Sequence, residues 1–170
     1  MEVLDFFLNI PESFVSGLRR DAFYRLIHNF PHEQVLTCSN ISQIFSNLKS
    51  RGYIKVEEKD GCESISFTNK ARLAIVDKIA QRSKTDNKYY LVSFNIPERL
   101  RLNRDKFRRT LKRLGFKQIQ KSLWVLNKNV GSTVELAAIE YNVNSYIAYF
   151  VSDNTNINDV INSLLSKKTD

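Results

Sequence analysis

The chain has 170 residues, of which 42% are hydrophobic and 11% aromatic, enough to fill one ordinary domain or two small ones and too many for a disordered chain. Its net charge of +8 lies entirely in the second half: residues 1–80 carry 10 Lys/Arg and 10 Asp/Glu, and residues 81–170 carry 16 and 8. Such a charge favours a polyanionic partner.

Several classes of protein are disfavoured by what the sequence lacks. No apolar stretch approaches 18 residues and the start has no basic signal-peptide segment, so we expect a cytoplasmic protein that does not enter a membrane. Cys38 and Cys62 have no C-x-x-C spacing, and Pro31 separates His28 from His32, so we expect reduced thiols, surface histidines and no metal. No glycine-rich phosphate loop occurs, and we expect no cofactor.

The first half predicts a helix, a second helix, a β-hairpin and a third helix after a short apolar segment at residues 3–10. Apolar residues at helical spacing mark a helix over residues 17–29, and those from Ile41 to Leu48 mark a second helix that Gly52 ends. Residues 53–58 and 63–68 alternate as strands around a K-D-G turn, and residues 69–80 form the last helix. This order is typical of a winged helix-turn-helix.

The outward face of the helix before Gly52 carries short polar side chains that can reach base edges or phosphates in a major groove. The alternative is a solvated face in a packing domain. The residues that we expect to touch DNA in this half are Ser39, Asn40, Ser42, Gln43, Ser46, Asn47, Lys49, Arg51 and Lys59.

Residues 81–88, "QRSKTDNK", contain no apolar side chain and predict a linker. The expected domains are a DNA-binding domain at residues 1–80 and a dimerisation domain at residues 89–170. The second domain begins with a buried strand that ends near Pro97, and continues with a helix, two short strands bent near Lys121, a helix and a fourth strand. The order βαββαβ is the ferredoxin-like arrangement, and a short C-terminal helix follows it. The fold class expected for the chain is therefore α+β.

The first helix of this domain is unusually basic. Phe107, Leu111 and Leu114 form its core stripe, and we predict that the rest of its surface faces solvent or phosphate. Trp124 could stack on bases with the neighbouring aromatic residues, but a core position is the better interpretation. The basic residues expected to meet DNA are Arg101, Arg104, Arg108 and Lys112.

Five separated segments resemble the central domain of the phenylacetate-repressor (PaaX) family, which is in turn similar to the small CRISPR-associated endonuclease Cas-two. They are residues 94–98 (F-N-I-P-E), Arg104-Asp105, Leu111, residues 114–116 (L-G-F) and residues 120–125 (Q-K-S-L-W-V). The resemblance covers residues 89 to about 152, and the N-terminal half fits a family that joins a winged helix to this unit. It implies a repressor that dimerises through paired sheets.

The resemblance also raises a nuclease alternative. In the endonucleases the residue that ends the first strand is an Asp, and two copies across the dimer axis bind a divalent cation. Here it is Asn95, a neutral ligand, so we expect no catalysis; a nuclease would have to use Asn95 and Glu98.

The function predicted is a transcriptional regulator, a repressor, that binds double-stranded DNA as a homodimer. A CRISPR-adaptation or nuclease subunit and a non-specific architectural DNA clamp remain alternatives. The sequence identifies neither the operator nor a small-molecule effector.

Overall fold

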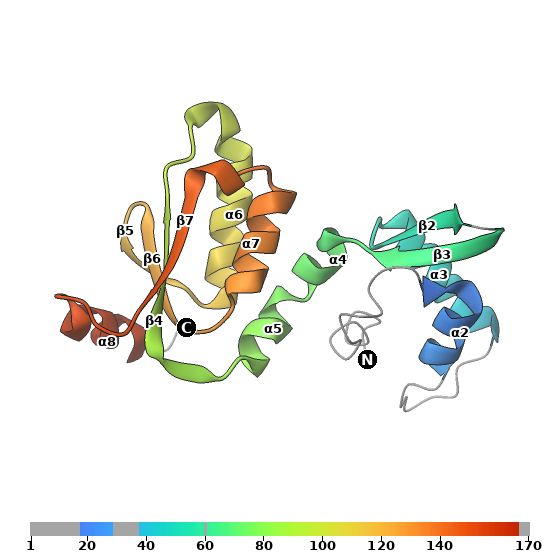
Figure 1. Ribbon diagram of the computed structural model, residues 1–170, viewed down its shortest axis with the longest axis horizontal. Helices are drawn as coiled ribbons and strands as arrows, with labels where there is room; N and C mark the ends of the chain where they lie inside the picture. Colours follow the sequence, from blue (N-terminus) through green and yellow to red (C-terminus); the bar gives the residue numbers. More distant parts are fainter. Residues whose placement is uncertain (1–17, 29–37, 60, 167–170) are drawn as a thin grey trace. The chain divides into compact units, whose positions relative to one another are not determined.

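The computed structural model describes residues 18–28, 38–59 and 61–166 (Figure 1). The chain divides into two compact units, Met1–Ile75 and Val76–Asp170. Within the described residues, each unit combines helices with an antiparallel sheet, so the α+β class is confirmed. None of the helices in the described ranges is long and apolar enough to cross a membrane.

The first unit packs two helices on a small sheet. Its elements are β1 (Leu18–Arg19), α2 (Arg20–His28), α3 (Cys38–Ser50), β2 (Ile54–Lys59), β3 (Cys62–Phe67) and α4 (Asn69–Ala74). The strands lie in the order β1-β3-β2, and Val56 is opposite Ile65 in the hairpin. The predicted hairpin is present, but Leu18 and Arg19 form a strand where we predicted the start of a helix. They pair with Ile65 and Ser64, a backbone interaction that helical periodicity does not reveal.

The core of the first unit lies between α2, α3 and the hairpin. Phe23 and Ile65 are fully buried, and the rings of Phe23 and Phe45 meet edge to face with centroids 5.6 Å apart. The predicted stripe of α3 packs here through Ile41, Phe45 and Leu48. The predicted apolar segment at residues 3–10 lies outside the described residues.

The region between the two sheets differs from the prediction. Instead of one helix over residues 69–80 and a linker at 81–88, the chain forms α4, a break at Ile75 and α5 (Val76–Arg82), and β4 begins at Thr85. The Thr68 side chain caps α4 by accepting from the Ala71 amide. At the polar start of β4, Thr85 pairs with Lys128, since backbone pairing does not require apolar side chains, and the register then shifts between Thr85 and Tyr90.

The second unit contains a four-stranded sheet in the order β5-β6-β4-β7. Its elements after α5 are β4 (Thr85–Phe94), η2 (Glu98–Leu100), α6 (Arg101–Leu114), β5 (Lys117–Gln120), β6 (Leu123–Lys128), α7 (Gly131–Glu140), η3 (Asn144–Tyr146), β7 (Ile147–Ser152) and α8 (Asn158–Ser166). The predicted order βαββαβ of strands and helices is therefore present. Figure 1 shows α6 and α7 side by side along the sheet.

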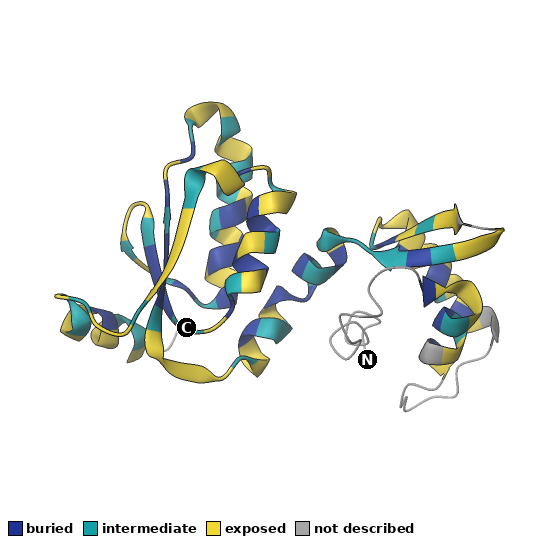
Figure 2. Cartoon of the chain, in the orientation of Figure 1, coloured by how far each residue is buried: buried dark blue, intermediate teal, exposed yellow. Residues whose placement is uncertain are grey.

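The two faces of this sheet are covered by different helices. Phe94 meets Phe107 of α6 with ring centroids 5.7 Å apart, whereas Leu91, on the opposite face of β4, packs with Ile161 of α8. Buried residues concentrate in β4, β6, α6 and α7, while β7 stays half-buried or exposed (Figure 2). Trp124 is only 1% exposed, so it belongs to the core and offers no stacking platform.

Candidate nucleic-acid interface and basic pocket

The polar residues predicted on α3 form one exposed helix face. The apolar stripe from Ile41 to Leu48 faces the core, which leaves the short polar side chains on the opposite side. The exposed residues on this face are Asn40, Ser42, Gln43, Ser46, Asn47, Lys49 and Ser50. The side chains of Ser39 and Lys59 lie outside the described residues.

Arg20 and Tyr24 of α2, which lie beside this face, are held in place by hydrogen bonds. Arg20 donates to Glu63 at 2.6 Å, which raises the pKa of the Arg20 guanidinium, and its charge lies 5.0 Å from the centre of the Phe45 ring. Tyr24 shares a 3.4 Å hydrogen bond with Ser42, and this bond lowers the pKa of the Tyr24 phenol. The neighbours of the polar face are therefore positioned before any ligand arrives.

The turns next to α3 also carry predicted residues. Arg51 is exposed, and its carbonyl oxygen accepts from Lys70 at 2.8 Å, which ties the end of α3 to the start of α4. At the hairpin tip Gly61 has a φ of +70°, a conformation that favours glycine, so the turn after Lys59 is set by the backbone.

The basic face of α6 is smaller than predicted, because some of its arginines hold the fold together. Arg104 is half-buried and donates to Glu98 at 2.9 Å and to the Ile96 carbonyl oxygen at 3.2 Å. Arg113 is bound to Asp77 of α5 at 2.7 Å. The prediction that everything outside the core stripe faces solvent or phosphate is therefore wrong for the half-buried Arg104 and Arg108. Arg113 is exposed although it is paired with Asp77, and Arg101 and Lys112 are exposed as predicted.

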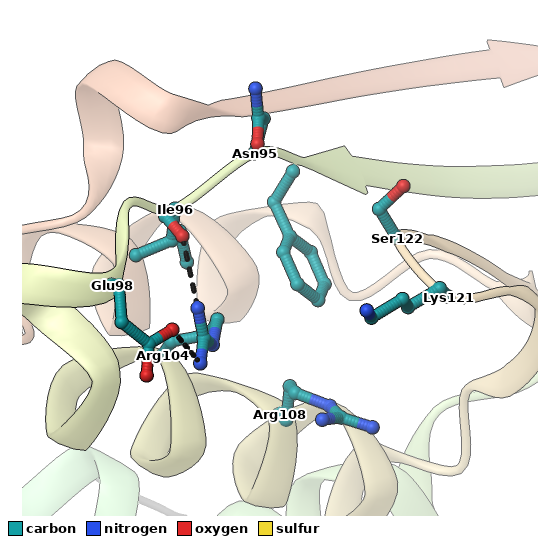
Figure 3. Close-up of a pocket in the computed structure, with 8 residues that line it drawn as sticks. Asn95, Ile96, Glu98, Arg104, Arg108, Lys121 and Ser122 are labelled. Carbon is teal, nitrogen blue, oxygen red and sulfur yellow. Dashed lines mark hydrogen bonds and ion pairs between the residues drawn. The ribbon is translucent and has the colours of Figure 1, made fainter.

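A pocket of about 360 Å³ lies where β4 ends, and it brings several predicted residues together. Antiparallel pairing of Ser93 with Leu123 places the β5–β6 turn beside the end of β4, where the Phe94 amide donates to the Ser122 carbonyl oxygen at 3.1 Å. The pocket is lined by Phe94, Asn95, Ile96, Glu98, Arg104, Arg108, Lys121 and Ser122 (Figure 3).

Three cations and one carboxylate line this pocket. The Glu98 carboxylate forms an ion pair with Arg104, and its second oxygen lies 3.8 Å from a guanidinium nitrogen of Arg101. Arg108 lies with its guanidinium carbon 5.9 Å from the centre of the Trp124 ring, and its buried Nε has no hydrogen-bond partner among the described residues. In Figure 3 the Lys121 ammonium extends from the β5–β6 turn into the space above Arg108, whereas the Asn95 side chain points away from the cations.

Lys121 and Ser122 were not predicted as site residues. The sequence pattern predicted only a bend near Lys121. This bend lies beside Asn95 because β6 is the neighbour of β4 in the sheet. A ferredoxin-like strand order imposed on the sequence would have placed them there.

Carboxylates in the described part of the chain do not gather as metal ligands do. There, no group of three or more His, Cys, Asp or Glu side chains could hold a metal ion. His28 is exposed and His32 lies outside the described ranges.

Comparison with known proteins identifies the second unit. Residues 82–162 match the family described as the PaaX protein central Cas2-like domain. No curated protein and no solved structure matches the chain significantly. The matched residues run from the end of α5 into α8 and include the whole four-stranded sheet, α6 and the basic pocket. The second unit is therefore similar to the central domain of the PaaX family.

Proposed function

We propose that this protein is a transcriptional regulator, a repressor, that binds double-stranded DNA as a homodimer. The observation that carries the proposal is the exposed polar face of α3, opposite a buried apolar stripe, in a chain whose other unit matches the PaaX central domain. Short polar side chains can approach base edges closely, and the basic charge of the second half supplies affinity for phosphates.

The order of elements in the first unit supports a winged helix-turn-helix. In such a domain α2 and α3 form the helix pair, and the β2–β3 hairpin is the wing beside the recognition helix. In this assignment Gln43 and Asn47, on the exposed face of α3, contact bases.

Phosphate contacts are assigned to the basic residues of both units. Lys49, Arg51 and Lys59 lie on or near α3 and the hairpin, and Arg101, Arg104, Arg108 and Lys112 lie on α6. Since Arg104 is already paired with Glu98, its contribution to DNA affinity should be smaller than that of Lys112.

A ferredoxin-like assignment of the second unit is supported by the order βαββαβ and by the strand order β5-β6-β4-β7. Apolar side chains on the edge strand β7 support dimerisation: Tyr149, Phe150 and Val151 are 37%, 44% and 48% exposed. Sedimentation at micromolar concentration should therefore give a dimer, and a monomer alone would contradict this part of the proposal.

A salt titration separates the regulator from a non-specific DNA clamp. Affinity should fall with rising salt in both cases, because phosphate contacts release counterions. Only a regulator retains a preference for one sequence over competitor DNA, of at least about a thousandfold at physiological salt. Equal affinity for all duplexes would favour the clamp.

A further inference from the structure

Arg108 and Lys121 are the least compensated charges in the pocket at the end of β4. Glu98, the one carboxylate in the lining, is taken by Arg104. Neither Arg108 nor Lys121 has an ion pair within the described part of the chain. The pocket therefore holds two like charges whose repulsion an anion between them would relieve.

The buried Nε of Arg108 strengthens this argument. Buried polar atoms without a hydrogen-bond partner are rare, and leaving one unsatisfied costs free energy. The Trp124 ring covers one side of the guanidinium, but a ring face does not replace an in-plane oxygen acceptor. No described residue accepts a hydrogen bond from the Arg108 guanidinium, so an oxyanion in the pocket is the ligand that could accept from its terminal nitrogens and neutralise its charge.

The placement of the two cations favours a tetrahedral anion. Arg108 comes from α6 and Lys121 from the β5–β6 turn, so their donors approach from different elements (Figure 3). A phosphoryl group presents oxygens in several directions and carries up to two charges, whereas a carboxylate is planar and carries one. The volume of about 360 Å³ also exceeds what a single ion needs and suits a phosphoryl group attached to a larger molecule.

We propose that this pocket is a phosphoryl-binding site in which Arg108 and Lys121 are the cationic ligands and the Arg104–Glu98 pair forms a wall. The phosphoryl group can belong to a small phosphorylated molecule or to the backbone of a nucleic acid. The proposal does not depend on base recognition by α3, since every residue in it belongs to the second unit.

Calorimetric titration of the full chain tests the site. The ligands are pyrophosphate and inorganic phosphate, and chloride keeps the ionic strength constant. We expect saturable binding that Arg108→Gln and Lys121→Gln each weaken at least about tenfold. Lys106→Gln is the matched control, because Lys106 is exposed on the same helix, lies outside the pocket lining and loses the same charge. It should change the affinity by less than about twofold.

Two results would overturn the proposal. One is no saturation below about 10 mM, a Kd that corresponds to less than about 3 kcal/mol of binding free energy. The other is equal weakening by Lys106→Gln, which would show that the anion responds to the general positive charge and not to this pocket. If Arg108→Gln does not fold because the contact with Trp124 is lost, the Lys121→Gln variant still tests the proposal, since Lys121 is exposed. Acetate binding as tight as pyrophosphate would contradict the assignment of a phosphoryl group.

Measurements of duplex binding distinguish the two possible sources of the phosphoryl group, the DNA backbone and a small molecule. If the backbone of DNA occupies the pocket, pyrophosphate competes with duplex DNA and Lys121→Gln weakens duplex binding more than Lys106→Gln does. If a small molecule occupies it, the two variants bind duplex equally. Intact duplex binding by a protein that does not bind pyrophosphate would refute the pocket proposal and leave the proposed function standing.

Discussion

Asn95, at the end of β4, is the residue on which the nuclease alternative depends. The backbone N–H of Asn95 donates to the Tyr146 carbonyl oxygen at 2.9 Å, which fixes the backbone at this position. The Asn95 side chain is neutral. Divalent cations such as Mg²⁺ are usually held by one or two carboxylates. Glu98, the acid nearest in the pocket, is paired with Arg104.

We therefore predict no metal-dependent cleavage of single- or double-stranded DNA or RNA by the native protein in Mg²⁺ or Mn²⁺. Asn95→Asp should gain binding of divalent cations, measured by calorimetry, because it adds the missing charge. Robust cleavage that co-purifies with the native protein and that a chelator abolishes would contradict this prediction.

Tyr90 and Asp86 form a second residue-scale feature with a measurable pH dependence. Tyr90 donates to Asp86 at 2.6 Å; this bond lowers the pKa of the Asp86 carboxyl and raises the pKa of Tyr90 to about 12. Because the fold favours the ionised carboxylate, the interaction stabilises the protein above the unfolded pKa of Asp86. The stabilisation is lost as the pH falls through the lowered pKa of the folded state.

Tyr90→Phe should lower the free energy of unfolding at pH 7, and the difference from the native protein should shrink below about pH 4. Tyr89→Phe is the control: Tyr89 donates to Asn162, a neutral amide, so its effect should not vary with acid pH. Urea unfolding at pH 7 and pH 3 measures both, and a constant Tyr90→Phe effect would refute the coupling.

At the scale of elements, α3 carries the proposed sequence recognition. Replacing Gln43 and Asn47 with Ala should reduce the preference for the specific duplex, each base contact contributing about 1–3 kcal/mol. Replacing Lys112 with Ala should instead weaken binding to all duplexes alike and flatten the salt dependence. Competition assays with specific and random duplexes give both values, and an unchanged preference in the α3 variant would exclude α3 as the recognition helix.

The start of α7 is packed against β7 more tightly than its sequence suggests. A Cβ built on Gly131 would lie 2.8 Å from the Tyr149 hydroxyl and 2.9 Å from its ring. Gly131→Ala should therefore destabilise the protein by about 1–3 kcal/mol. In a Tyr149→Ala background the same change should be neutral or stabilising, since alanine favours helix over glycine. Thermal unfolding of the four proteins tests this, and an equal cost in both backgrounds would contradict the proposed clash.

The elements that the sequence predicted well are those whose own side chains specify them. The α3 and α6 stripes show helical spacing, and Gly115, with a φ of +95°, ends α6 as a glycine in the left-handed region does. β1, the break at Ile75 and the polar start of β4 were missed because each depends on tertiary pairing or packing. No pocket was predicted: Arg104, Arg108 and Glu98 were named as candidate site residues, but Lys121 was not, because strand order and not sequence spacing places it in the same pocket as Arg108.

At the scale of the whole molecule, the chain divides charge between its two units. The first 80 residues are electrically neutral and carry the exposed polar helix face, whereas the remaining residues carry the net +8 and the PaaX-like domain. In the proposed regulator this division assigns base contacts to the first unit, and attraction to phosphate and dimerisation to the second. A dimer brings two copies of α3 to two half-sites, so the bound sequence should have two-fold symmetry.

Selection of bound sequences from a pool of random duplexes tests this account most directly. The full chain at physiological salt should enrich an inverted repeat whose half-sites are separated by about one helical turn or a multiple of it. The Gln43→Ala, Asn47→Ala double variant should enrich it less. Recovery of a pool with no shared sequence, from a protein that still binds DNA, would contradict the regulator and leave a non-specific DNA-binding protein.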